Sequence, residues 1–197
     1  MLSKPVAIAA VALLTLALTG CAPDGGDTPG TSTTPSASQG PTDPPAPAAT
    51  DQPGDGFDAT PVTVECSALV TPQAVYDYNP NYSLQPSFTP VAGSDVATIM
   101  DNKGVGCSWV NQTSGETFVV AAAQLAAADI ESIKQVLSSR STPVTGVGDS
   151  AFFTASCGVG VAKVFSGSYW IVATSPAFYE IAEAKPLLQA ALSALGR

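Results

Sequence analysis

The chain has no histidine among its 197 residues. Without histidine, no Ser-His-Asp or Cys-His arrangement can form, and no histidine-ligated zinc, iron or copper site can form either. Basic residues are also scarce, with seven Lys and Arg against sixteen Asp and Glu. This surplus of negative charge opposes binding to nucleic acid and to anionic lipid headgroups, so we expect no nucleic-acid partner.

The N-terminal residues have the pattern of a bacterial lipoprotein signal peptide. Lys4 precedes an apolar run from Val6 to Leu18, which is shorter than the ~20 residues of a membrane-spanning helix. Two small residues and a cysteine follow, as in a lipobox, whose cysteine thiol accepts a diacylglyceryl group. We therefore expect residues 1–20 to be removed and Cys21 to anchor the protein at the extracytoplasmic face of the cell membrane by its acyl chains. The alternative is a secreted protein cleaved at a small residue.

The segment 21–60 has the composition of a linker. It is rich in Pro, Gly, Ser and Thr, and from Ala22 to Thr60 it carries six Asp but no Lys or Arg. Such a segment cannot bury enough apolar surface to offset the entropy of ordering it, so we expect it to be disordered. As a flexible chain its ends would lie about 35 Å apart, which suits a spacer in the cell wall. An unselected soluble linker would have the same mechanics.

Residues 61–197 have the length of one domain with a single core. Hydroxyl caps at Thr71 and Ser94 predict two short helices. Two later segments each read as a β-hairpin around a Ser-Gly turn, followed by a helix. The expected elements are a strand at Val62–Val64, helices at Pro72–Tyr78 and Asp95–Asn102 with Gly104 ending the second, hairpins at Gly104–Ala121 and Gly158–Ala173, a helix at Ala127–Ser139, a strand at Ala151–Phe153, and a helix at Ala177–Leu195 that Pro186 should kink or split.

This order of elements predicts an α+β domain with an antiparallel β-sheet of about five strands, helices packed on one face, and a ββα unit that occurs twice. A doubly wound parallel sheet is disfavoured, because the strands come in hairpins rather than alternating with helices. A small β-barrel with peripheral helices is the alternative. In the predicted sheet, Trp109, Phe118, Trp170 and Val172 would supply much of the core.

Three cysteines in the domain, Cys66, Cys107 and Cys157, allow one disulfide and leave one residue over. Outside the cytoplasm such cysteines commonly form disulfides. Closing the loop 66–107 or the loop 107–157 would stabilise the fold by ~4 kcal/mol in either case. Energetics alone therefore leave both pairings open.

Short motifs resemble a family of actinobacterial cell-envelope lipoproteins whose domain has no known function. The motifs are a cysteine before the Thr71-Pro72 helix start, Cys107-Ser108-Trp109 opening a strand, and the turn Gly146-Val147-Gly148-Asp149-Ser150-Ala151-Phe152. The resemblance covers most of residues 62–195. It implies a Cys66–Cys107 disulfide, an α+β fold like that of the Mog1/PsbP proteins, and no established enzymatic activity. Cys157 has no counterpart in the family pattern, and we expect it to be a buried free thiol.

Other candidate motifs fail on their context. Residues 146–151 match a dinucleotide-binding fingerprint but follow a Ser/Thr/Pro loop and open a strand, not a helix. Gly148-Asp149-Ser150 is similar to an esterase block whose mechanism needs a histidine. Asp95, Asp101 and Asn102 lack the alternating oxygen ligands of a calcium loop. Glu180 and Glu183 have no matching acidic pair for glycoside hydrolysis. We expect no cofactor, no metal and no catalytic site.

An aromatic loop is the best candidate for a partner-binding surface. It contains Tyr76, Tyr78, Asn79, Asn81 and Tyr82. Aromatic faces beside amide groups suit a sugar or a protein. In the alternative interpretation, the tyrosines cover the sheet and the asparagines form turns.

We therefore predict a non-enzymatic binding or interaction module, displayed outside the cytoplasmic membrane by its lipid anchor. Its partner would be an envelope protein, a cell-wall glycan or a lipid. The alternative is a carrier of a lipid or other apolar ligand, held in a cavity between sheet and helices. An enzyme and a solute-binding component of a transporter are weaker hypotheses, since the domain is short for the usual two-lobed solute binder.

Overall fold

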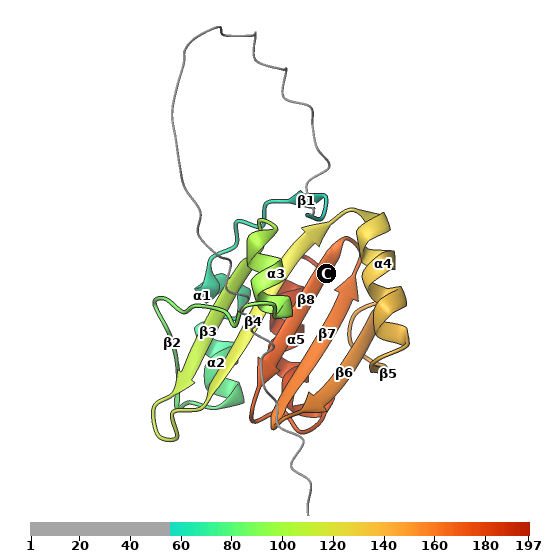
Figure 1. Ribbon diagram of the computed structural model, residues 1–197. Helices are drawn as coiled ribbons and strands as arrows, with labels where there is room; N and C mark the ends of the chain where they lie inside the picture. The colour runs from blue at the N-terminus through green and yellow to red at the C-terminus, as the bar shows by residue number, and fades with distance from the viewer. Residues whose placement is uncertain (1–55) are drawn as a thin grey trace, which may run out of the picture. The chain divides into compact units, whose positions relative to one another are not determined.

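A computed structural model of the chain describes residues 56–197, and the predicted signal peptide, the lipidation site Cys21 and most of the predicted linker lie outside them. The described elements in chain order are β1 (Ala59–Thr60), α1 (Cys66–Leu69), α2 (Pro72–Tyr78), β2 (Tyr82–Leu84), α3 (Asp95–Asp101), β3 (Val105–Asn111), β4 (Thr117–Leu125), α4 (Ala127–Ser138), β5 (Thr142–Val144), β6 (Ser150–Ser156), β7 (Val159–Ser166), β8 (Tyr169–Ser175) and α5 (Ile181–Ala194). Helices and strands are therefore mixed along the chain in an α+β arrangement (Figure 1).

The strands form one antiparallel sheet, which is larger than predicted. Its order is β2-β3-β4-β8-β7-β6-β5, and β1 pairs with β4 to make an eight-stranded sheet. Strands β4 and β8 lie at its centre and join the two predicted hairpins, with Ala121 opposite Val172. The prediction of about five strands is wrong, because β1, β2 and β5 have only two or three residues each. Strands this short carry too few residues to show alternation of apolar and polar side chains.

The prediction that helices cover one face of the sheet is also wrong. In Figure 1, α3 and α4 lie in front of the sheet, whereas α2 and α5 lie behind it. Central strand β4 explains why, since Phe118, Val120 and Ala122 belong to one apolar cluster and Ala121 and Ala123 to the other. All five are fully buried. A continuous apolar run of this kind is typical of a strand covered on both faces.

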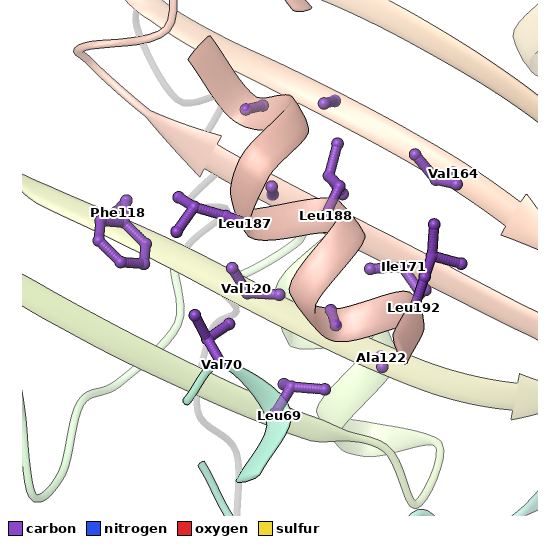
Figure 2. Packing of buried hydrophobic residues seen from close by; sticks show 14 of the residues in the cluster. Leu69, Val70, Phe118, Val120, Ala122, Val164, Ile171, Leu187, Leu188 and Leu192 are labelled. Atoms are coloured by element: carbon purple, nitrogen blue, oxygen red, sulfur yellow. The ribbon is translucent and has the colours of Figure 1, made fainter. Parts of the chain in front are cut away.

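Helix α5 forms the centre of the rear layer. Figure 2 shows Leu188 and Leu192 on the side of Val164 of β7 and Ile171 of β8, and Leu187 beside Phe118 of β4. Leu187 and Leu188 are fully buried. Burying such a side chain contributes about 1.5–3 kcal/mol, so this helix face stabilises much of the domain.

The start of α5 differs from its prediction. The helix begins at Ile181 rather than Ala177, and it continues through Pro186 as one element. Glu180 and Glu183 form a capping box at its N-terminus, in which Glu183 accepts a hydrogen bond of 2.8 Å from the backbone N–H of Glu180. This pair therefore has a structural role in starting the helix.

The predicted core aromatics are buried, but they serve opposite faces. Trp109 stacks on Phe118 with ring centroids 4.9 Å apart in the rear cluster. Trp170 stacks on Phe165 at 6.5 Å in the front cluster, which also contains Val172. The two tryptophans are therefore separated by the sheet.

Local sequence signals gave accurate helix starts. The Thr71 hydroxyl accepts a hydrogen bond from Ala74 N at 3.2 Å, and the Ser94 hydroxyl accepts one from Ala97 N at 3.1 Å. Helices α2, α3 and α4 lie within a residue of their predicted bounds. The strand expected at Val62–Val64 is absent, and β1 begins earlier, at Ala59.

Gly104 is required for a reason other than the predicted one. The residue with left-handed backbone after α3 is Lys103, with φ 60°, and not the glycine. A Cβ on Gly104 would lie 2.6 Å from the carbonyl oxygen of Ala122. The glycine therefore allows the end of α3 to approach β4 closely.

The disulfide implied by the family resemblance is present. Cys66, the first residue of α1, is bonded to Cys107 of β3, with a Cα–Cα distance of 5.5 Å. Cys107 is buried in the sheet. Its partner Cys66 belongs to helix α1, which lies beside the β3 end of the sheet (Figure 1). The bond therefore fastens a helix of four residues, too short to be stable alone, to the sheet.

The prediction for Cys157 is wrong in both respects. Cys157 is exposed rather than buried, and it is disulfide-bonded rather than free. It lies in the two-residue turn between β6 and β7, where Cys157 and Gly158 have φ of 50° and 76°. Two left-handed residues are the geometry of a tight hairpin turn, which projects from the sheet into solvent.

Candidate functional site

The structure divides the predicted aromatic surface between core and solvent. Tyr76 and Asn81 are exposed, whereas Tyr82 is only 8% exposed and Tyr78 is half-buried. The Asn79 side-chain carbonyl accepts a hydrogen bond of 2.9 Å from the backbone N–H of Asn81. These positions match the alternative interpretation, in which tyrosines cover the sheet and asparagines form turns.

Tyr78 and Tyr82 pack as core aromatics. Their ring centroids lie 5.6 and 4.8 Å from that of Phe118. Burial, reinforced by the neighbouring Tyr82, raises the pKa of Tyr78 to about 12. The Tyr78 hydroxyl therefore stays protonated at neutral pH and is unsuited to act as a general base.

Alanine substitutions should distinguish the two environments. We expect Tyr82→Ala to lower the free energy of unfolding by about 3 kcal/mol, because it leaves a cavity beside Phe118. Tyr76→Ala should change it by less than about 0.5 kcal/mol, since Tyr76 is 63% exposed. Urea unfolding followed by circular dichroism measures both, and Tyr179→Ala at a 78% exposed position is the control. Equal losses for the two tyrosines would contradict this placement.

A shallow groove of about 310 Å³ lies beside Tyr76, between α2 and β2. Val75, Tyr82, Leu84 and Trp109 contribute to its wall. The side chains lining it are mainly apolar, and none carries a charge. It offers contact area but few groups that would orient a ligand.

A larger cavity, open to solvent, lies on the opposite face of the sheet. Its volume is about 590 Å³, and its walls come from α3, from α4 and the residues after it, and from strands β6, β7 and β8. In Figure 1 this is the face on which α3 and α4 lie over the strands. The lining residues are Phe57, Asp95, Thr98, Ser132, Ile133, Val136, Leu137, Arg140, Ser141, Thr154, Lys163 and Trp170.

An ion pair forms part of the wall of this cavity. Lys163 Nζ of β7 lies 2.8 Å from Asp95 Oδ2 of α3, and their side chains are 16% and 31% exposed. Lys163 stands in an otherwise apolar strand segment, between Ala162 and Val164. The ion pair therefore joins α3 to the sheet and places a cation in the cavity wall.

Trp170 supplies an unused hydrogen-bond donor. The residue is 3% exposed, and its Nε1 has no hydrogen-bond partner. Its ring lies between Phe165, stacked at 6.5 Å, and Phe57, edge-on at 6.3 Å. A buried N–H without an acceptor costs about 1–3 kcal/mol, so such groups usually have a partner in the functional state.

The site lacks the pairings that acid–base or metal chemistry needs. Asp95 is the only carboxylate in the cavity lining, and it is already bound to Lys163. Residues 56–197 contain no group of three or more His, Cys, Asp or Glu side chains placed to hold a metal. In the same range, no helix is long and apolar enough to cross a membrane.

The sequence suggested a cavity between sheet and helices as an alternative, but it did not identify the residues that line this one, and Asp95 was considered only as a calcium ligand. One local signal existed, because a lysine within the apolar run Val161–Phe165 is unusual for a strand buried on both faces. Nothing local connects Lys163 to Asp95, which lies 68 positions earlier. Tertiary contacts alone bring Arg140 and Trp170 to the same cavity.

No family model matches the chain, and neither a curated protein nor a solved structure matches it. The similarity to actinobacterial lipoproteins therefore stays a prediction from short motifs.

Proposed function

We propose that this chain is a non-enzymatic binding module, anchored outside the cytoplasmic membrane through Cys21, whose folded domain carries a small ligand with an apolar body. The cavity of about 590 Å³ beneath α3 and α4 is the observation that carries this proposal. Its volume lies within the roughly 300–1,000 Å³ typical of small-molecule sites. Its position, between sheet and helices, suits a carrier.

The chemistry of the walls supports the same function. Ile133, Val136 and Leu137 present one face of α4 to the cavity, and Phe57 and Trp170 add aromatic surface. A few polar groups are placed among these apolar ones, as in other ligand sites. The tyrosine loop is a weaker candidate for the site, because Tyr78 and Tyr82 are occupied in the core.

The missing catalytic groups also support a binding role. The sequence has no histidine, and the only acid of the cavity is held in an ion pair. A lipid anchor followed by a polar spacer would keep such a domain near the membrane surface, where apolar ligands concentrate.

Filling the cavity should abolish binding. Ser132 is exposed on α4 and lines the cavity, so Ser132→Trp would place an indole there without disturbing the core. We expect wild-type domain to bind the neutral apolar dye N-phenyl-1-naphthylamine saturably, and Ser132→Trp to weaken that binding by about tenfold or more. Dye fluorescence titration measures the affinity.

Gln135→Trp provides the matched control, because Gln135 is exposed on the same helix but does not line the cavity. This variant should bind the dye as the wild type does. Equal affinity of wild type and Ser132→Trp would show that the dye binds elsewhere and would contradict the proposal.

A further inference from the structure

We infer that the cavity selects an amphipathic anion, with an alkyl or similar apolar body and one carboxylate. This inference rests on the proposed function, since it assumes that the cavity holds a ligand. It adds the charge of that ligand and the residues that recognise it. The headgroup would lie near Arg140 and Lys163, and the apolar body against α4 and the aromatic side chains.

The balance of charge in the cavity is the first observation. Arg140 and Lys163 are its two cations and Asp95 its one anion, which leaves a net charge of +1. The whole chain has a formal net charge of −9. A locally positive cavity in an acidic protein attracts an anion there and repels it elsewhere, which favours selective binding.

Arg140 is the group best placed for recognition. It is exposed just after α4, and neither ion pair among residues 56–197 uses it. A guanidinium can donate two parallel hydrogen bonds to one carboxylate. Because Lys163 is already bound to Asp95, Arg140 would carry most of the charge recognition.

The Trp170 donor is the second, independent observation. Its Nε1–H is buried and without an acceptor, in a residue that lines this cavity. A hydrocarbon or a quaternary ammonium compound has no acceptor to offer it. A carboxylate does, and Trp170 lines the same cavity as Arg140 and Lys163. The donors of the site therefore match a ligand rich in acceptors.

The apolar body has a matching surface. Ile133 and Leu137 lie one helical turn apart on α4 and both line the cavity, and Val136, between them, is 52% exposed. An alkyl chain along this face would cover Val136, which is otherwise exposed to water, and the exposed part of Ile133. The site thus combines an apolar wall with a cationic end.

Three probes with one alkyl chain and different headgroups test the inference. Decanoate, decan-1-ol and decyltrimethylammonium would each displace N-phenyl-1-naphthylamine from the protein, at concentrations below micelle formation for the two ions and below the solubility limit for the alcohol. We expect decanoate to bind about fivefold more tightly than decan-1-ol, and the cation to bind most weakly. Raising the salt concentration should weaken decanoate binding and leave decan-1-ol binding unchanged.

Two substitutions should act in opposite directions. Arg140→Gln removes a cation and should weaken decanoate binding about fivefold, without affecting decan-1-ol. Asp95→Asn releases Lys163 and raises the charge of the cavity, so it should strengthen decanoate binding about two- to fivefold. A purely structural role for the ion pair would not produce tighter binding. Arg197→Gln, which lies outside the cavity lining, is the control.

The outcomes separate this inference from the proposed function. If decanoate and decan-1-ol bind equally, and Ser132→Trp blocks both, the cavity carries a ligand but the preference for an anion is overturned. If the dye binds saturably but no probe displaces it, the inference fails and the carrier function stands. If the dye does not bind, both fail. If Asp95→Asn weakens decanoate binding in a folded variant, or decanoate binding is independent of salt, the charge argument is overturned.

Discussion

Replacing Cys21 with serine is expected to move the protein completely from the membrane fraction to the soluble fraction. A diacylglyceryl group is attached to the sulfur of a lipobox cysteine, and a serine hydroxyl cannot form that thioether. No helix in residues 56–197 is long and apolar enough to cross a membrane. Metabolic labelling with an alkyne fatty acid, followed by cell fractionation, measures attachment and location together.

The control for this experiment is Cys157→Ser, which should keep both the label and the membrane location. Peptide mapping without reduction adds an independent test of whether the Cys21 sulfur is available to carry the lipid. A peptide that joins Cys21 to Cys157 would contradict the anchor, since one sulfur cannot carry both a thioether and a disulfide. An unlabelled wild-type protein would contradict it as well.

Helix starts and hairpins could be predicted because their signals are local. Thr71 and Ser94 each accept a hydrogen bond from a backbone N–H three residues later, so cap and helix lie in one short stretch. The two Ser-Gly turns lie between long strands of apolar and β-branched residues. Neither feature depends on the rest of the fold.

The side of the sheet on which each helix packs could not be predicted in the same way. Helices α4 and α5 both follow a hairpin, and both have an apolar stripe, yet they cover opposite faces. The repeated ββα order in the sequence is therefore not a repeat in space. The only sequence signal was the unbroken apolar run Phe118–Ala123, which indicates burial on both faces.

The residues of the candidate site could not be grouped from the sequence, for a related reason. Its charged lining residues lie far apart in the chain, since Asp95 is in α3, Arg140 follows α4 and Lys163 is in β7. Conversely, the tyrosines that cluster in the sequence separate in the structure, because α2 and β2 turn Tyr78 and Tyr82 toward Phe118. The predicted tyrosine surface therefore forms only in part, because Tyr76 is exposed but Tyr82 is buried.

Removing the Cys66–Cys107 disulfide should lower the free energy of unfolding by about 4 kcal/mol. The bond closes a loop with a sequence separation of 41, and its loss restores the conformational freedom of that loop in the unfolded chain. For a domain of this size the melting temperature should fall by roughly 10–15 °C. Calorimetry of a Cys66→Ala, Cys107→Ala double variant measures the change, whereas a reductant would also act on Cys157.

The position of the disulfide explains why other contacts should not compensate. Helix α1 has only four residues and joins the rear layer through Leu69, which is fully buried, and Val70 just beyond its end. Without the bond, these two side chains alone must hold α1 against β3 and α5. Ser67→Ala, at the exposed neighbour of Cys66, is the control and should change the free energy by less than about 0.5 kcal/mol. A loss below about 1 kcal/mol in the double variant would mean that the unfolded chain keeps this loop closed by other contacts.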